Sequence, residues 1–337
     1  MKSNLNWAVL GTGVIANEMA AALREQGRHI YSVGNRTYEK GVAFAEKYGI
    51  ETVYPDMDDV FRDPEVDAVY LTTPHNTHYA FAKKALEHGK HVYIEKAITL
   101  NVRELDDLCA LAEEKGLLLA EAMTIWHMPL YRELWQLVAS GELGRVQLIT
   151  MNFGSFKDYD MTNRFFNMDL AGGALLDIGV YAISLVRSFM SSCPHEVASQ
   201  WQPSPTGSDE MDTILLKNPD GQLATIALSM HSKQPKRAMV SCEKGYIEIM
   251  EYPRGERAVI VDAETGATRT VEAGETAKAL QYELEDFEAA VSLLDGSSPD
   301  AMKKAYEQMK LPLTRDVMDL MTALRKEWGM QYPNEQW

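Results

Sequence analysis

The stretch Trp7–Ala16, WAVLGTGVIA, decides the fold, because it joins a short apolar strand to a glycine-rich turn and the start of a helix. The turn has the form G-x-G-x-x-A. Gly11 permits a tight turn, Gly13 lets the backbone approach a pyrophosphate, and Ala16 is small enough for the helix to pack closely on a sheet. The N-terminus of that helix would offer free N–H groups to phosphate oxygens.

Strand and helix patterns alternate through the next hundred residues. Apolar strands are predicted at 29–33, 51–54, 66–72, 91–95 and 117–120, and helices at 38–48, 77–88 and 102–115. Strands separated by helices of about 10 to 15 residues are typical of a parallel, doubly wound sheet. The sequence therefore predicts a Rossmann-type NAD(P)-binding domain at residues 1–121, with α/β architecture.

An acid and a base end one of these strands, in His91–Thr99, HVYIEKAIT. Val92 and Ile94 can face a core, whereas Glu95 and Lys96 emerge where the strand stops. Ligands of open α/β sheets bind outside the carboxyl ends of the strands, so Lys96 is expected to point at the bound ligand. The alternative is an ordinary solvent-exposed lysine.

The end of the second strand predicts the choice of cofactor. A carboxylate there would bind the ribose 2′-hydroxyl of NAD, whereas an arginine accommodates the 2′-phosphate of NADP. The sequence here is Gly34-Asn35-Arg36-Thr37, with no acid before Glu39. This favours NADP, with Arg36 on the phosphate. The alternative is an exposed Arg36 and NAD held through Asn35.

Two histidines and an asparagine follow the fourth strand, in Thr72–His78. They have no carboxylate or cysteine beside them, so no metal site is expected. Asn76 or Thr77 is expected to cap the next helix, and His75 to lie near cofactor or substrate.

The pattern changes after residue 121. A helix is predicted at 129–139 and a strand at 146–153, and Gly172-Gly173 opens a helix on which Asp177 and Tyr181 share a face. Turn signals at 218–221, 244–245 and 264–266 separate consecutive strands and predict a largely antiparallel sheet. Helices at 275–294 and 299–327 end the chain. Residues 122–337 are thus expected to form an α+β substrate-binding and oligomerisation domain, and the final helix is a candidate for packing back on the first domain.

Asp177 and Tyr181 also allow a purely structural interpretation, with Asp177 as a helix cap and Tyr181 as a half-buried packing residue.

Composition restricts the partners. The 337 residues carry 33 basic and 49 acidic side chains, a net charge of −16, so nucleic acid and anionic membranes are not expected as partners. Cys109, Cys193 and Cys242 are widely spaced and indicate reduced thiols in a cytoplasmic protein. The N-terminal residues run straight into a strand, and no apolar segment was identified that approaches a membrane span, so neither export nor insertion is expected.

Four motifs in this order resemble the glucose–fructose oxidoreductase, inositol dehydrogenase and rhizopine catabolism (Gfo/Idh/MocA) family. They are GTGVIA at 11–16, TPHNTHY at 73–79, HVYIEKAIT at 91–99 and AGGALLDIGVY at 171–181. The stretch EAMTIWHMPLYRELWQLVASGELGRV at 121–146 is similar to the dimeric dihydrodiol dehydrogenase branch and related sugar dehydrogenases.

The resemblance implies that Lys96 transfers the proton beside the reacting hydroxyl or carbonyl, with Asp177 and Tyr181 across the cleft as further catalytic residues. Many members have histidine in place of Tyr181, and the dihydrodiol dehydrogenase branch has tyrosine. The expected cofactor contacts are Gly11, Thr12, Gly13, Val14, Ile15, Asn35, Arg36, Thr73, Pro74, His75, Asn76, His78, Glu95 and Lys96. The expected substrate contacts are Lys96, Trp126, Arg164, Phe165, Asp177 and Tyr181.

The resemblance also implies the reaction, a hydride transfer between NADP, or NAD, and a hydroxyl or carbonyl carbon of a sugar, cyclitol or dihydrodiol. Two alternatives are an NAD(P)-binding transcriptional regulator and an NAD-dependent glycosidase. Family structures imply a homodimer or higher oligomer built on the second domain's sheet. Ala97 stands where the family usually has proline, and a cis bond there would cost about 2.5–4 kcal/mol, so a trans bond is expected.

Overall fold

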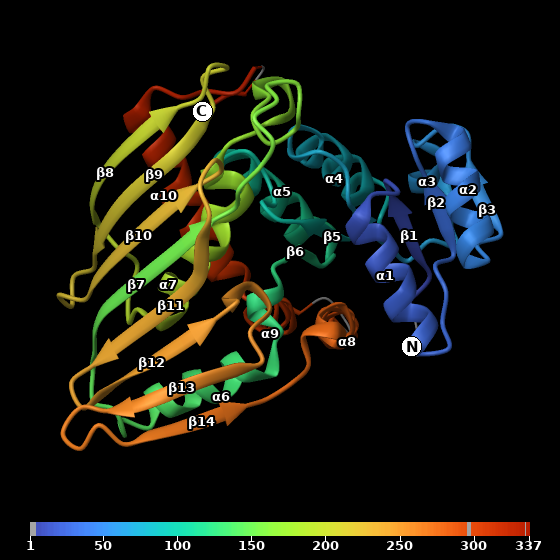
Figure 1. Ribbon diagram of the computed structural model, residues 1–337. Coiled ribbons are helices and arrows are strands. Elements are labelled where there is room, and N and C mark those ends of the chain that lie inside the picture. The colour runs from blue at the N-terminus through green and yellow to red at the C-terminus, as the bar shows by residue number, and fades with distance from the viewer. Residues whose placement is uncertain (1–4, 295–297, 334) are drawn as a thin grey trace. The chain divides into compact units, whose positions relative to one another are not determined.

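The computed structural model describes residues 5–294, 298–333 and 335–337 (Figure 1). The first four residues, on which part of the expectation of no export signal rests, lie outside this description. The chain forms two compact units. The first contains Met1–Ala122 and Leu280–Pro312, and the second contains Met123–Ala279 and Leu313–Trp337.

A six-stranded parallel sheet forms the centre of the first unit. Its strands are β1 (Trp7–Leu10), β2 (Ser32–Gly34), β3 (Thr52–Tyr54), β4 (Ala68–Leu71), β5 (His91–Glu95) and β6 (Leu119–Ala122). Their order is β3-β2-β1-β4-β5-β6, and every neighbouring pair is parallel. The order reverses between β1 and β4, the point at which doubly wound sheets bind ligands. The predicted Rossmann fold is confirmed.

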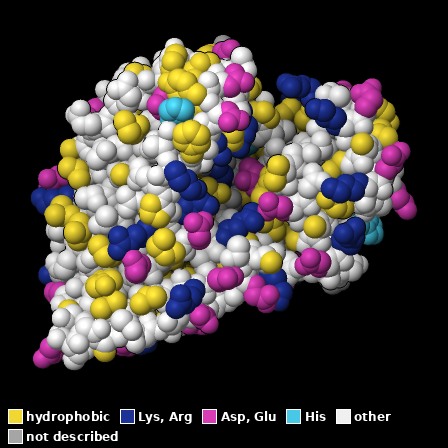
Figure 2. Space-filling model, in the orientation of Figure 1, with side chains coloured by type: hydrophobic (Ala, Val, Ile, Leu, Met, Phe, Trp, Pro, Cys, Tyr) yellow, Lys and Arg dark blue, Asp and Glu magenta, His cyan; other side chains and the backbone are white. Residues whose placement is uncertain are grey.

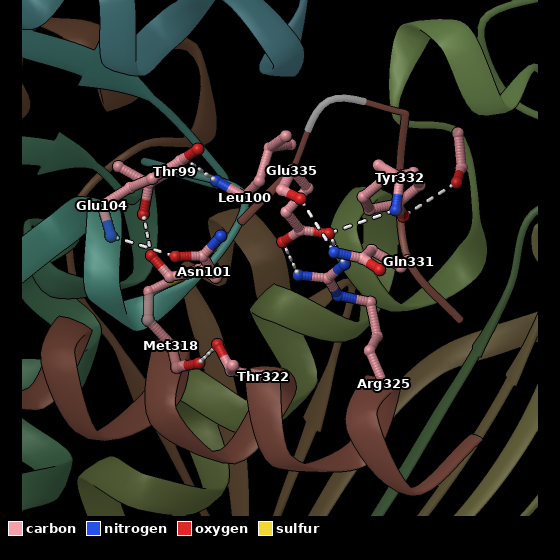
Figure 3. A network of polar contacts seen from close by, with 11 residues as sticks. Thr99, Leu100, Asn101, Glu104, Met318, Thr322, Arg325, Gln331, Tyr332 and Glu335 are labelled. Carbon is pink, nitrogen blue, oxygen red and sulfur yellow. Dashed lines mark hydrogen bonds and ion pairs between the residues drawn. The ribbon is translucent and has the colours of Figure 1, made fainter. Parts of the chain in front are cut away.

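The helices of this unit are α1 (Val14–Glu25), α2 (Tyr38–Tyr48), α3 (Asp59–Arg62), α4 (His78–Glu87), α5 (Val102–Lys115), α8 (Ala279–Leu293) and α9 (Pro299–Gln308). α2 and α5 have the predicted bounds, because Gly49 and Gly116 end them in the left-handed conformation. At the start of α5 the Asn101 side chain accepts from the Glu104 N–H, and the Glu104 carboxylate accepts from the Leu100 N–H (Figure 3). The short helix α3 was not predicted.

Late residues complete the core of the first unit. The ring of Phe287, on α8, lies 5.0 Å from that of Trp7 and 4.9 Å from that of Tyr93, centroid to centroid. The Trp7 indole N–H donates to Glu288 (2.8 Å), and the Tyr93 hydroxyl donates to Glu283 (3.2 Å). Segment 280–312 therefore packs in the first unit, and its expected place in the second domain, with only the final helix as a candidate for packing back, is wrong.

The single helix predicted at 299–327 is wrong. The structure has α9 and then α10 (Leu311–Trp328), with Lys310 between them at φ 57°. Pro312 lies in the first turn of α10, where its missing N–H costs nothing, so the proline starts a second helix instead of continuing the first.

An eight-stranded sheet dominates the second unit, in the order β14-β13-β12-β11-β7-β10-β9-β8. The strands are β7 (Val146–Gly154), β8 (Glu196–Pro203), β9 (Asp209–Lys217), β10 (Leu223–Ser229), β11 (Gln234–Cys242), β12 (Gly245–Met250), β13 (Arg257–Asp262) and β14 (Thr268–Glu272). Only β7 and β10 pair in parallel among these described strands. The predicted largely antiparallel sheet and its three tight turns are confirmed.

Helices cover one face of this sheet. They are α6 (Pro129–Ala139), α7 (Val180–Phe189) and α10. α7 packs on β7 and β10, and Trp328 of α10 stacks on Trp201 of β8 with ring centroids 5.4 Å apart. In Figure 1 the sheet lies in front of α7 and α10, so the viewer sees its other face.

The stretch Met168–Phe189 is long and apolar enough to cross a membrane by length and composition, contrary to the expectation that no apolar segment approaches a membrane span. Residues making up 83% of its most apolar window are buried inside the fold, as in the core helix of a globular protein.

Candidate active site

The glycine turn follows β1 and requires a glycine first. Gly11 has φ +98°, and a Cβ there would lie 2.7 Å from the Thr72 hydroxyl oxygen and 3.0 Å from the Thr72 carbonyl oxygen. Gly11 also donates its N–H to the Gly34 carbonyl oxygen (2.9 Å). The ends of β1, β2 and β4 thus meet at this residue, which leaves no room for a side chain.

The next residues leave open space where a ligand would approach. A Cβ at Gly13 would meet no atom within 4 Å, and the Val14 side chain beside it is 80% exposed. Ala16, one turn on, is fully buried against the sheet. The Thr12 hydroxyl donates to the Asn35 side-chain oxygen (3.2 Å). The open helix N-terminus therefore fits the pyrophosphate of a dinucleotide.

Asn35 and Arg36 follow β2, as predicted. The Asn35 amide donates to the Thr37 carbonyl oxygen (2.7 Å), and Arg36 is exposed. Arg36 forms no ion pair with any residue that the structure describes.

The segment after β4 begins with a short 3-10 helix at His75–Thr77, which leads into α4. Thr77 lies at the N-cap position of α4, but its hydroxyl donates to the Pro74 carbonyl oxygen (2.7 Å) and no side chain caps the helix. The predicted side-chain cap is therefore wrong. His75 donates from Nε2 to the Lys96 carbonyl oxygen (2.9 Å), which ties this segment to the end of β5.

His78 is fully buried between the same two loops. Its Nε2 lies 2.8 Å from the Thr73 carbonyl oxygen and its Nδ1 lies 3.0 Å from the Ala97 carbonyl oxygen. Burial lowers the pKa of His78, although both carbonyl groups favour the protonated ring. Both ring nitrogens thus face backbone, so His78 joins the loops instead of reaching the surface where a cofactor would lie.

The peptide bond between Lys96 and Ala97 is cis, so the expectation of a trans bond is wrong. The carbonyl groups of both residues face imidazole nitrogens, of His75 and His78 respectively. The next N–H, of Ile98, donates to the Glu121 carboxylate (3.1 Å). Three side chains that are distant in sequence therefore hold this segment, which local sequence alone does not reveal.

Glu95 and Glu121 have partners that were not predicted from the sequence. The Tyr70 hydroxyl donates to the Glu95 carboxylate, and burial raises the pKa of Tyr70 well above its usual value, with the Glu95 charge adding to the effect. Glu121 is 1% exposed. Glu121 could have been recognised from the sequence, because it is an acid in an otherwise apolar strand. No sequence pattern pointed to Tyr70.

In the second unit, Arg164, Phe165 and Asp177 lie together. The Arg164 guanidinium is 3.6 Å from the Asp177 carboxylate and its carbon lies 4.3 Å from the Phe165 ring centroid. The Lys157 ammonium lies 4.2 Å from the same centroid. Arg164 is exposed, whereas Asp177 is nearly buried, so the Phe165 ring contacts two cations, one of which pairs with a nearly buried carboxylate.

Asp177 and Tyr181 come from one continuous helical segment, but it begins as a π-helix at Leu175–Gly179 before α7. The predicted helix is confirmed, and its first turn is wider than the α-helix assumed. The Tyr181 ring is half-buried, with its centroid 6.4 Å from that of Phe153.

Trp126 is 1% exposed, and its indole N–H has no acceptor among the described residues. It therefore lies beneath the surface, and its predicted contact with substrate stays a prediction. Within the described residues no group of three or more histidine, cysteine, aspartate or glutamate side chains could hold a metal ion.

Comparison with known proteins agrees with this geometry. Residues 5–123 match an oxidoreductase family model with an NAD-binding Rossmann fold, and residues 131–248 match the GFO/IDH/MocA C-terminal domain. An uncharacterized oxidoreductase of Rhizobium meliloti is 32% identical over 230 residues, 67% of this chain and 68% of that protein. A trans-1,2-dihydrobenzene-1,2-diol dehydrogenase of Mus musculus is 27% identical over 253 residues, 73% of this chain and 75% of that protein.

A 3-ketoreductase from Actinomadura kijaniata, crystallised with NADP and TDP-benzene, has a similar structure. The TM-score is 0.83 at 22% identity, with 96% of this chain and 98% of that chain covered, which shows a shared fold. The chain is therefore an oxidoreductase with an NAD(P)-binding Rossmann domain, and it belongs to the Gfo/Idh/MocA family.

Proposed function

We propose that the protein is an NADP-dependent dehydrogenase or reductase that acts on a hydroxyl or keto group of a sugar, cyclitol or dihydrodiol. The observation that carries the proposal is the placement of Lys96. It follows β5 at the carboxyl edge of the sheet, and His75 and His78 hold the carbonyl groups of Lys96 and Ala97. The dihydrodiol dehydrogenase relative supports the substrate class.

Each of these residues has a distinct role in the proposed reaction. A bound nicotinamide cofactor would supply the hydride donor or acceptor for the reacting substrate carbon. Lys96 holds or releases the proton of the oxygen attached to the reacting substrate carbon. Glu95, which accepts a hydrogen bond from the Tyr70 hydroxyl, contacts the cofactor. Arg164 and Phe165 bind the substrate, and Asp177 and Tyr181 orient its hydroxyl groups or share in the proton transfer.

A panel of polyols, sugars and dihydrodiols, assayed in both directions with NADP and NAD, tests this function. We expect turnover of at least one member with cofactor consumed in equal amount. Tightly retained NAD with no net turnover of added cofactor would indicate a glycosidase instead. Cofactor binding with no turnover, together with a ligand-dependent affinity for DNA, would indicate a regulator.

The preference for NADP rests on exposed Arg36 and on the missing carboxylate after β2. We expect Arg36→Ala to weaken NADP binding by about 10-fold or more, because a charge-assisted contact contributes about 1.5–3 kcal/mol, and to leave NAD binding nearly unchanged. Fluorescence titration of the reduced cofactors measures both constants. Arg62→Ala, at another exposed arginine of the same unit, is the control. Equal affinities for NADP and NAD in the wild type would contradict the preference.

The second unit's sheet is proposed to form a homodimer. Its uncovered face carries Met211, Leu215, Leu223 and Met250, each about half exposed. On the face visible in Figure 2, hydrophobic side chains lie among charged ones. Sedimentation at micromolar concentration should give twice the mass of one chain. Leu215→Lys should shift it toward the monomer, whereas Leu293→Lys, at an exposed leucine of α8, should not. A monomeric wild type would contradict this proposal.

The proposed location is the cytoplasm, supported by three cysteines that all remain free thiols in the structure. The net charge of −16 supports the absence of nucleic acid or anionic membrane partners.

A further inference from the structure

The helix that carries Asp177 and Tyr181 is preceded by a turn in close contact with the Arg164 loop. Gly172 donates its N–H to the Asn167 carbonyl oxygen (2.9 Å), and Gly173 donates to that of Phe165 (3.0 Å). A Cβ at Gly172 would lie 2.7 Å from the Arg164 carbonyl oxygen. The position of this turn therefore determines where the loop and the helix stand relative to each other.

Asp209, the first residue of β9, holds the same turn. Its carboxylate accepts from the Leu175 N–H (2.5 Å), and a Cβ at Gly173 would overlap it. Asp209 is fully buried. The preceding residue, Ser208, donates its hydroxyl to the Phe166 carbonyl oxygen (3.1 Å). One short segment thus contacts both the helix start and the Arg164 loop.

A second buried acid lies beside the first. Asp212 is 1% exposed, and its two carboxylate oxygens and the free oxygen of Asp209 have no donor among the described residues. Two neighbouring carboxyl groups cannot both be ionised at low cost. Burial raises the pKa of Asp212 well above its usual value and that of Asp209 to about 6.

The end of the chain contributes a second contact to the turn (Figure 3). Arg325 of α10 pairs with both carboxylate oxygens of Glu335, at 2.7 Å each, and the Tyr332 N–H donates to the same carboxylate (3.1 Å). The Tyr332 hydroxyl donates to the Gly172 carbonyl oxygen (2.9 Å). The positive charge of Arg325 also favours the ionised form of Asp209.

We propose that Asp209 is a positioning residue for the reaction, which fixes the Gly172–Leu175 turn and thereby the direction of the helix bearing Asp177 and Tyr181, with Tyr332 as its second support. This inference rests on the proposed function only in the roles given to Asp177 and Tyr181. Asp209 itself is buried and touches no reactant. The groups that face it are Asp212, Arg325 and Tyr332.

Two variants with the same number of side-chain heavy atoms as Asp209 separate positioning from packing. Asp209→Asn keeps an acceptor for the Leu175 N–H, whereas Asp209→Leu removes it. We expect Asp209→Leu to lower kcat by about 10- to 100-fold, since a displacement of about 1 Å has effects of this order. Asp209→Asn should stay within about threefold of wild type. The cofactor dissociation constant should be unchanged in both, because the glycine turn belongs to the first unit. Equal kcat in the two variants would overturn the proposal.

Hydrogen exchange gives a measurement that needs no turnover. Peptides covering residues 172–181 should exchange faster in Asp209→Leu than in wild type, and at the wild-type rate in Asp209→Asn. If the wild type turned over no substrate, the proposed function would fail while this exchange test would still decide the role of Asp209. If Asp209→Leu does not fold, Tyr332→Phe replaces it, since only a hydroxyl is lost. Unchanged exchange of these peptides in Tyr332→Phe would then overturn the proposal.

Discussion

Replacing Lys96 by Met is expected to lower kcat by about 100-fold or more while the fold and the cofactor affinity are kept. General acid–base catalysis contributes typically 10²–10⁴-fold, and methionine nearly matches the length of lysine without carrying a proton. The glycine turn proposed to bind the cofactor follows β1, whereas Lys96 follows β5. Steady-state kinetics with the best substrate of the panel, together with a cofactor titration, measures the effect. Lys40→Met, at an exposed lysine of α2, is the control.

Tyr181→Phe is the necessary companion to Lys96→Met. A raised KM with little change in kcat for Lys96→Met would mean that Lys96 binds substrate equally in the ground and transition states. A large loss in Tyr181→Phe with near-normal turnover in Lys96→Met would make the tyrosine the acid and base. Severe losses in both would indicate a coupled pair, whose individual contributions single variants do not separate.

Glu335→Gln is expected to reduce the free energy of unfolding by about 3–5 kcal/mol, the range for removing one partner of a buried ion pair. The side chains of Arg325 and Glu335 are both 0% exposed, so the substitution leaves a guanidinium charge buried without its carboxylate. The Tyr332 N–H loses a charged acceptor as well. Urea unfolding followed by the second unit's tryptophan fluorescence should show a lower midpoint at a similar slope.

An exposed ion pair of the same unit provides the matched control. Glu142 pairs with Arg269, and both side chains are at least half exposed. Glu142→Gln should change the unfolding free energy by less than about 1 kcal/mol, because solvent screens such pairs. Similar losses of unfolding free energy in Glu142→Gln and Glu335→Gln would show that burial does not increase the contribution of the Arg325–Glu335 pair to stability.

Much of the first unit could be predicted because local signals determine it. α2 and α5 end at Gly49 and Gly116 as expected, since only a left-handed residue closes them there. The glycine turn follows β1 and Glu95 ends β5 as expected, because local sequence patterns determine both positions. The packing of segment 280–312 in the first unit could not be predicted, because the apolar face of a helix does not indicate which of two hydrophobic cores it packs against.

The site residues that escaped prediction depend on distant partners. The cis bond after Lys96 lies between carbonyl groups held by His75 and His78, and no local pattern joins these residues. Asp212 did leave a signal, because it is in phase with the buried residues Ile214 and Leu216 along β9. An acid at an inward-facing position of an alternating strand indicates a buried polar role, so this pattern could have identified Asp212.

Because residues 280–312 belong to the first unit, the core of that unit is completed only after they have been synthesised. The chain leaves the first unit after Ala122 and returns to it only at Leu280. While the ribosome synthesises the intervening residues, the rings of Trp7 and Tyr93 lack Phe287, their partner in the finished core. The N-terminal sheet is thus begun first and completed late. A nascent chain halted before Leu280 would keep an apolar surface uncovered and would be a natural client for chaperones.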